Sequence, residues 1–477
     1  MNDYSDATPP IPPHSADAAR WEHTRLRRRM IEGRWMADLE ENLRAHLGHT
    51  RAAALGKLDA SSNVFKSISR QLAATYDRAP TLTHADPAAA QRMDATIYEA
   101  GLWPLMQRFQ SRVIALREHF MRIEIDERGA VTYRPISPDL MLAYSDPSNP
   151  DKPVRVMEAR LKRDGWCWVL LDISDPEMPR YEVRAVNPGA ADGLGEDLSP
   201  LYLGEQPLSG DAYPYRYSDG RPFIPGTLYH AAMNGDRLWD PYEGIEVVEG
   251  SLNAAVGWSF WFHCLRSASW PQRYMAGVVP RGARAVDSST SKRHEVIADP
   301  ATVLLLEHDG SDHASQAVIG QWGPAAEVGE LAEALSQFEA RVAEFADVSP
   351  SDVQRLGGTA RSGYAIALTN QGKRDAQQRM EPVFRRADEE LLSKTAAILN
   401  RSTGAGLPED GYRLAYHAVP RSPQEIREER EHVLALLDRG LISPVRAYAQ
   451  LHGVDERTAE IRLEAIRRQR IDLNLTR

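Results

Sequence analysis

The stretch RLGGTARSGYAIALTNQGKRD, residues 355–375, decides how this chain is interpreted. Its GTARSG segment has the glycine spacing of a nucleotide-binding P-loop. Such a loop follows a strand and needs Lys and then Ser or Thr directly after the second glycine, to reach the phosphates and Mg²⁺. Here Tyr364 and Ala365 hold those two places, and the preceding segment has a helical pattern. We therefore predict a mobile, glycine-bearing loop that exposes Arg355 and Arg361.

Helical periodicity lies on both sides of this loop. In residues 327–345 the apolar side chains recur every three or four positions, which indicates one apolar face on a helix. The rest of that helix is mostly acidic and includes Glu330, Glu333, Glu339 and Glu344. Residues 364–400 keep a helical stripe well beyond the average helix length of about 12 residues. Pro382 lies inside this stripe, so a kink is expected there.

The remaining pattern predicts an α+β fold in which helices predominate. In residues 20–47 and 93–120 the apolar side chains recur at helical spacing, so both ranges are expected to be helical. Alternating segments across residues 120–186 predict one small antiparallel sheet, with a hairpin around Arg128 and Gly129. Residues 187–221 are rich in turn-forming residues and are expected to form long loops. Residues 251–267 are apolar on nearly all sides, which indicates a helix buried in a core or between subunits.

The C-terminal residues contain clear helix signals. Ser422-Pro423 with Glu425 is a capping box, and the helix it starts is expected to stop at Gly440. Ser443-Pro444 starts a second helix, and Asp455 caps a third that runs to about residue 470. The basic end, RLEAIRRQRIDLNLTR, suits the C-terminal end of a helix dipole, and contact with nucleic acid is the less favoured interpretation.

Composition limits the classes of function. The chain has 477 residues and a formal net charge of −10, which argues against clamping DNA through the whole surface. Its two cysteines, Cys167 and Cys264, are expected to be buried thiols in a reducing compartment. Residues 1–15 contain Pro and Asp and have no apolar core. We therefore expect a disordered or extended arm and no signal peptide. No apolar run approaches the ~20 residues of a membrane span.

One cluster could bind a metal ion. The segment EHDGSDH places Glu307, His308, Asp309, Asp312 and His313 close together, and these are groups that Zn²⁺ or another divalent ion uses. The spacing gives no further sign of a metal site, and the polarity of a loop explains the cluster better. No HExxH or GxSxG motif occurs. We therefore predict no catalytic residue, no resident metal and no cofactor, with a metal-dependent hydrolase as the alternative.

Five segments in this order resemble the portal proteins of tailed bacteriophages. They are NVFKSISRQLAATYDRAP, RPISPDLMLAYSDPSNPDKPVRVMEAR, RPFIPGTLYHAAMNGDRLWDPYEGIEVVEGSLNAA, RSGYAIAL and LLDRGLISPVRAYAQLHGVDERTAEIRLEAI. The last match is the most specific, and the first departs from the family pattern by lacking its more apolar ending. The resemblance covers most of the chain and lies more in the order of the segments than in any single motif.

This resemblance implies a ring, usually dodecameric, at one capsid vertex, through whose channel double-stranded DNA is packaged and ejected. The implied parts are an arm (1–15), a wing (16–249 and 364–421), stem helices (250–270 and 326–347), a clip (271–325), a tunnel loop (348–363) and a helical crown (422–477). The implied partners are the major capsid protein, terminase and a head–tail adaptor, without a membrane. The tunnel-loop candidates are Arg355, Leu356, Gly357, Gly358, Arg361 and Gly363. The acidic channel-wall candidates that the resemblance implies are Glu330, Glu333, Glu339 and Glu344. A different ring-forming head–tail connector and a virion-associated hydrolase are the alternatives.

Overall fold

The computed structural model of the chain has the α+β fold that the sequence predicts. Helices hold 53% of the residues and strands 19%. The structure describes residues 14–50, 52, 58–59, 61–126, 128–163, 165–204, 206–233, 236–269, 272–276, 278–280, 306–308, 318–322, 327–348, 363–417, 423–452 and 454–475. The chain divides into unit 1, which is Met1–Thr24, Ser69–Pro241 and Asp347–Arg477, and unit 2, which is Arg25–Ile68 and Tyr242–Ala346.

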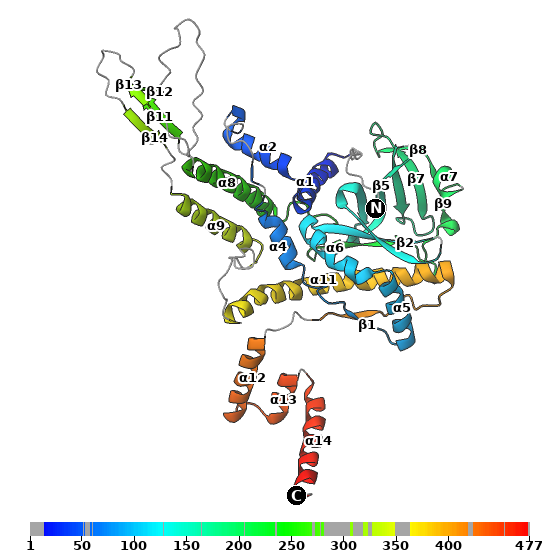
Figure 1. Cartoon of the computed structure of the whole chain (residues 1–477). Coiled ribbons are helices and arrows are strands. Elements are labelled where there is room, and N and C mark those ends of the chain that lie inside the picture. The colour runs from blue at the N-terminus through cyan, green and yellow to red at the C-terminus, as the bar shows by residue number, and fades with distance from the viewer. Residues whose placement is uncertain are drawn as a thin grey trace. The chain divides into compact units, whose positions relative to one another are not determined.

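Among the described residues from 118 to 230, unit 1 forms two antiparallel sheets rather than the single sheet expected (Figure 1). One has the strand order β4-β5-β6-β7-β8, with β9 paired to β7, and the other has the order β10-β2-β3. The expected hairpin joins β2 to β3, and Gly129 in its turn has a φ of 81°, which favours glycine. The strands are β2 (Glu118–Ile125), β3 (Val131–Ile136), β4 (Met141–Asp146), β5 (Asn149–Lys162), β6 (Gly165–Asp172), β7 (Arg180–Val186), β8 (Leu194–Asp197), β9 (Leu208–Ser209) and β10 (Gly226–His230).

The expectation of one sheet was wrong because side-chain alternation does not specify which strands pair. The segment after β3 turns through a short 3₁₀ helix, η1 (Pro138–Leu140), and β4 then pairs with β5 instead of extending the first hairpin. The expected loop over residues 187–221 is also partly regular. It contains β8, β9, α7 (Ser199–Leu203) and η2 (Gly210–Ala212).

Three helices enclose the main core of unit 1. They are α5 (Pro87–Glu99), α6 (Leu102–Leu116) and α11 (Gly363–Thr403). In this core the ring of Tyr229 lies 5.0 Å from that of Phe109 and 5.8 Å from that of Phe384, measured between centroids. Phe384 and Leu391 are fully buried on α11. A short pair, β1 (Thr81–Thr83) with β15 (Arg413–Ala415), closes the same unit.

Glycines divide two of the helices that the sequence predicts as continuous. Gly101 has a φ of 65° between α5 and α6, and β2 already begins at Glu118. Gly33 has a φ of 81° between α1 (Ser15–Glu32) and α2 (Met36–Leu47). Across that second break Arg29 donates two hydrogen bonds, of 2.8 and 2.6 Å, to the carboxylate of Asp38. This bidentate pair joins the two helices.

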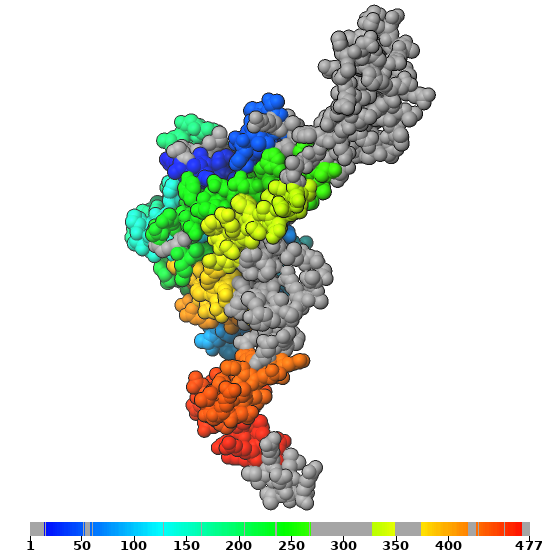
Figure 2. Space-filling view, turned by 90° about the vertical axis from the view of Figure 1, so that its left-hand side faces the viewer, coloured from blue at the N-terminus to red at the C-terminus, as the bar shows by residue number. Residues whose placement is uncertain are grey.

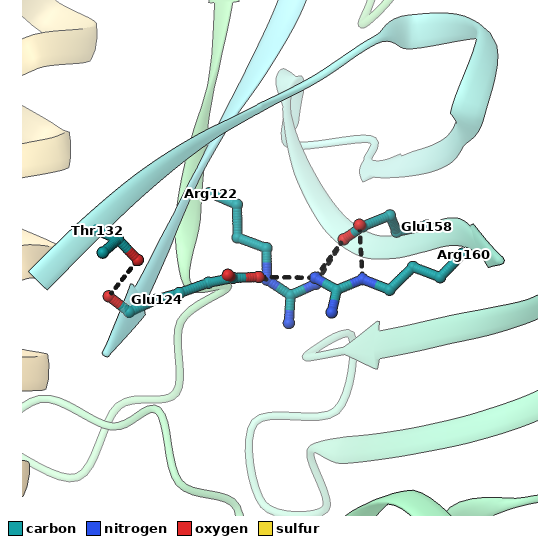
Figure 3. A network of polar contacts seen from close by, with 5 residues as sticks. All are labelled: Arg122, Glu124, Thr132, Glu158 and Arg160. Atoms are coloured by element: carbon teal, nitrogen blue, oxygen red, sulfur yellow. Dashed lines mark hydrogen bonds and ion pairs between the residues drawn. The ribbon is translucent and has the colours of Figure 1, made fainter. Parts of the chain in front are cut away.

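A network of four charged side chains, two of them buried, joins strands β2 and β5 of unit 1 (Figure 3). Arg122, 4% exposed, donates through Nη1 to the carboxylate of Glu158, which is 5% exposed. Arg160 donates to Glu158 at 2.7 Å and to Glu124 at 2.9 Å. Burial acts to raise the pKa of Glu158, but the two guanidinium groups outweigh it, and the pKa lies below its ordinary value. The two buried charges, Arg122 and Glu158, are therefore paired with each other.

We predict that Glu158→Ala lowers the free energy of unfolding by about 3–5 kcal/mol, because it removes the buried partner of Arg122 and leaves only the more exposed Glu124 beside that buried charge. Urea denaturation of the full chain measures this change. Glu177→Ala is the control, because Glu177 is exposed and should change stability by no more than about 0.5 kcal/mol. Equal effects of the two substitutions would contradict the prediction.

A second buried carboxylate, Asp388 on α11, accepts hydrogen bonds from three tyrosines. The hydroxyl groups of Tyr76, Tyr229 and Tyr416 lie 2.6, 2.7 and 2.5 Å from its oxygens. These residues come from separate parts of unit 1, so the carboxylate ties α11 to three other segments. Burial raises the pKa of Asp388 to about 6, although the three hydroxyl groups act in the opposite direction.

This raised pKa predicts that the free energy of unfolding depends on pH. The folded chain holds the Asp388 proton more tightly than the unfolded chain, so the contribution of Asp388 to stability is complete below about pH 4 and is lost as the pH rises through about 6. Through ionisation of Asp388, the native chain should lose up to about 3 kcal/mol of unfolding free energy between pH 4 and pH 7. Asp388→Asn should not show this loss, because asparagine does not ionise. Denaturant unfolding at both pH values measures it, and Asp94→Asn, at an exposed position, should show the same loss as the native chain.

Unit 2 is built around two long helices, α8 (Ile245–Ser269) and α9 (Val328–Glu344). The hydroxyl of Ser251 on α8 accepts a 3.2 Å hydrogen bond from the backbone N–H of Phe65, in α4 (Val64–Leu72). The unit also contains two antiparallel strand pairs among the described residues. They are β11 (Gln272–Ala276) with β14 (Val318–Trp322), and β12 (Val278–Pro280) with β13 (Leu306–His308).

The C-terminal region forms the three helices that the sequence predicts, α12 (Pro423–Asp438), α13 (Pro444–His452) and α14 (Glu456–Leu475). Ser443 Oγ accepts from the N–H of Arg446 at 3.1 Å, and Asp455 accepts from the N–H of Thr458 at 3.0 Å. Both are N-terminal caps. Gly440, with a φ of 70°, follows α12. However, α14 ends at Leu475, beyond the expected end near residue 470.

Candidate functional site

Two glycines allow α8 and α9 to pack closely. A methyl group added at Gly250 would lie 2.7 Å from Cγ2 of Val342, and one added at Gly257 would overlap the side chain of Leu335. The glycines are seven residues apart, about two helical turns, so they lie on the same side of α8. The Leu335 and Val342 side chains occupy the space that the missing Cβ atoms leave, and they fix how α9 is turned about its own axis.

Glu339 belongs to this packed side of α9. One oxygen of its carboxylate accepts a 2.7 Å hydrogen bond from the indole N–H of Trp258 and another hydrogen bond from the hydroxyl of Ser62. The side chain is half-buried. Glu339 comes four residues after Leu335 and three before Val342. This helical spacing places it on the packed side of α9, unlike the other three glutamates. Trp261 adds a 2.9 Å hydrogen bond to the carbonyl of Val328.

The opposite side of α9 is exposed and acidic. Glu330, Glu333 and Glu344 are all exposed, and Arg341 is the cation among them. Figure 2 shows α9 (yellow-green) at the surface beside α8 (green). Three of the four predicted acidic residues thus share a solvent-facing surface, which we call the acidic face, whereas Glu339 lies against α8.

The last two turns of α8 leave apolar side chains uncovered. Phe262 is 50% exposed and Leu265 is 36% exposed, while Trp258 and Trp261 are partly exposed. In contrast, Val248, Ala254 and Ala255 in the first half of the helix are fully buried. The prediction of burial on more than one side is therefore met inside unit 2 only for the first half of α8. An exposed apolar surface of this kind is typical of a contact with another chain.

Most of the predicted tunnel loop lies outside the residues that the structure describes. This applies to Arg355, Leu356, Gly357, Gly358 and Arg361. The sixth candidate, Gly363, is the first residue of α11. Pro382 lies inside α11, as the sequence predicts. The kink at this proline stays a prediction.

The structure brings together no metal site among the residues it describes. Glu307 and His308 lie in β13, whereas Asp309, Asp312 and His313 are outside those residues. No group of three or more metal-binding side chains occurs in the described part of the chain. Cys167 is buried, and Cys264 is only partly so. Within the same residues, no helix has the length and apolar character needed to cross a bilayer.

The solved structures that are similar to this chain include components of a gene transfer agent (GTA) particle. Chains from the neck of the native GTA particle, computed with C12 symmetry, and of the empty GTA particle, computed with C6 symmetry, are each 13% identical to it. Their TM-scores are 0.43 and 0.44, over 82% and 85% of this chain and 90% and 93% of theirs. A chain from the virion of the native particle is also 13% identical, with a TM-score of 0.41 over 83% of this chain and 91% of its own. TM-scores this low carry no argument about function.

No protein-family model and no curated protein matches the chain.

We predict that Gly250→Ala destabilises the chain by about 1–3 kcal/mol, because the added methyl forces Val342 to move within a packed contact. Gly329→Ala is the matched control on α9. A methyl there would meet nothing within 4 Å, so the lower entropy of the unfolded chain should stabilise the fold by up to about 1 kcal/mol. Thermal and denaturant unfolding measure both variants. A neutral or stabilising Gly250→Ala would show that the close approach is not required.

Proposed function

We propose that this chain is a structural subunit of a phage-like particle, and specifically a portal subunit. Copies of it form a ring at one capsid vertex, and double-stranded DNA passes through the ring during packaging and ejection. The observation that carries the proposal is the acidic face of α9, which the packing of Gly250 and Gly257 turns away from α8. The sequence resemblance to portal proteins supports the same assignment.

An acidic wall suits a channel that DNA must traverse without adhering. Carboxylates repel the phosphate backbone, and each additional basic side chain in the wall would instead add a salt-sensitive contact. Glu330, Glu333 and Glu344 are the proposed wall residues, while Glu339 holds α9 to Trp258. We further propose that Arg355 and Arg361, on the loop before α11, make the few phosphate contacts, which carry no sequence information.

The other proposed contacts follow the division of the chain. Residues 271–325 would form the clip that meets terminase and the head–tail adaptor, and the wing would meet the major capsid protein. Unit 2 holds residues 250–270 and 326–346 of the proposed stem and residues 271–325 of the proposed clip, together with residues 25–68. The uncovered Phe262 and Leu265 on α8 suit a contact between neighbouring copies.

The test is a charge reversal on α9. Particles assembled with the Glu330→Lys, Glu333→Lys, Glu344→Lys triple variant should protect at least about tenfold less DNA from nuclease, because the wall would bind the passing phosphates. The control is Glu99→Lys, Glu177→Lys, Glu196→Lys, which makes the same change in charge at exposed positions of unit 1.

Negative-stain images of the purified native chain test the ring itself. A chain that forms no ring with a central opening would overturn the portal assignment. Rings with normal DNA protection in the α9 triple variant would overturn only the role of the acidic face. The Arg355→Ala, Arg361→Ala double variant should lower DNA retention while leaving the ring intact.

A further inference from the structure

The three C-terminal helices bury little apolar surface. In the described part of this region, the buried apolar residues are Val433, Ala447, Ala449 and Ala459. Alanine contributes little burial, so the helices share a small core. Larger apolar side chains remain exposed on the same helices and between them: Ile426 by 39%, Leu434 by 49%, Leu441 by 67%, Ile461 by 63% and Ile466 by 40%.

Single exposed apolar residues are normal on a protein surface. On α12 and α14, however, exposed apolar residues share a helix face with exposed charged residues. On α12, Glu431, Leu434 and Asp438 are all exposed and stand at positions i, i+3 and i+7, so they line one side of the helix. On α14, Ile461 and Arg468 are likewise seven residues apart and exposed.

The two helices differ in charge. Helix α12 carries five acidic residues against two basic ones: Glu425, Glu428, Glu429, Glu431 and Asp438 against Arg427 and Arg430. The second half of α14 has the opposite sign, with Arg467, Arg468 and Arg470 against Asp472. Arg468 has Glu464 of its own helix at 3.6 Å, but both side chains are well exposed, and such a surface pair contributes little.

The helix dipole does not account for the arginines of α14. Its effect fades beyond the last turn. Because α14 continues to Leu475, Arg467 and Arg468 lie about two turns before its end. The sequence interpretation that assigned the basic end to the dipole depended on a helix ending near residue 470.

We propose that α14 of one copy packs against α12 of the neighbouring copy of this chain. Ile461 of α14 meets Leu434 of α12, and Arg468, on the same face as Ile461, faces Glu431 and Asp438 with Arg467 beside it. The contact joins two different surfaces, so it repeats around a closed ring. The charges steer the encounter and the apolar residues supply the buried area. This inference rests on the ring assembly proposed above.

A charge swap on the full chain tests the contact. Arg467→Glu, Arg468→Glu should lower the ratio of ring to free subunit about tenfold at about 0.05 M salt, and much less at about 1 M salt, where charges are screened. Glu431→Arg, Asp438→Arg should have the same effect. The variant with all four substitutions should regain the ring, because the attraction is restored with reversed sign. Mass photometry at several protein concentrations measures these ratios.

Two further variants complete the experiment. Leu434→Gln, Ile461→Gln should weaken the ring at both salt concentrations, because it removes apolar contact and not charge. Arg108→Glu, Arg112→Glu, at exposed positions of α6, is the control for charge reversal and should leave the ring unchanged. Circular dichroism melting of each variant checks that the subunit is folded.

The outcomes separate this contact from the ring itself. If the native chain forms no ring, the proposed function fails and the contact fails with it. If the native chain forms rings and the two charge-reversal pairs leave them unchanged, only the contact is overturned. Unchanged rings with reduced DNA binding in the Arg467→Glu, Arg468→Glu variant would show that the basic end of α14 meets DNA and not a second copy. Failure of the fourfold variant to recover would also overturn the pairing.

Discussion

The close approach of α8 and α9 at Gly250 and Gly257 is the constraint on which the functional interpretation depends. Because Leu335 and Val342 fill the space beside these glycines, α9 has one orientation about its axis. That orientation directs Glu339 toward Trp258 and leaves Glu330, Glu333 and Glu344 in solvent. A helix with the same acidic content but a different rotation would bury carboxylates and expose apolar residues. The negative charge of the exposed side of α9 therefore follows from its packing against α8.

The buried carboxylates of unit 1 differ from the exposed carboxylates of α9 because they have partners within the chain. Glu158 lies between two guanidinium groups, and Asp388 accepts three tyrosine hydroxyl groups. Each buried oxygen obtains partners that replace water, as the high cost of an unpaired buried charge requires. The acidic face of α9 has no such arrangement for its three exposed glutamates among the interactions that the structure describes. Acidic residues thus hold the unit 1 fold together, while those on α9 remain available to act on something outside the chain.

Much of the secondary structure was predictable, because periodicity and caps are local signals. Helices α13 and α14 begin at the predicted Ser443 and Asp455 caps, whereas Ser422 lies outside the described residues, and the β2–β3 hairpin turns at Gly129. Strand pairing was not predictable, because it depends on contacts between distant segments, so one expected sheet became two. The candidate site divides in the same way. The exposure of three glutamates on α9 followed from the helical stripe, whereas the partners of Asp388 come from sequence positions as far apart as Tyr76 and Tyr416. The arginines of the predicted loop lie outside the described residues, and their role stays a prediction.

Pro382 gives α11 a mechanical property that its length alone would not. A proline has no N–H to donate to the carbonyl four residues earlier, so the helix has one fewer internal hydrogen bond at that point. Just after it, Phe384, Asp388 and Leu391 are held firmly in the unit 1 core. A force applied to the first half of α11 would therefore bend the helix near residue 382 before it disturbed that core. Because Ala376 and Gln377 before the proline are buried as well, the missing hydrogen bond makes residue 382 a point of bending between two anchored parts of α11.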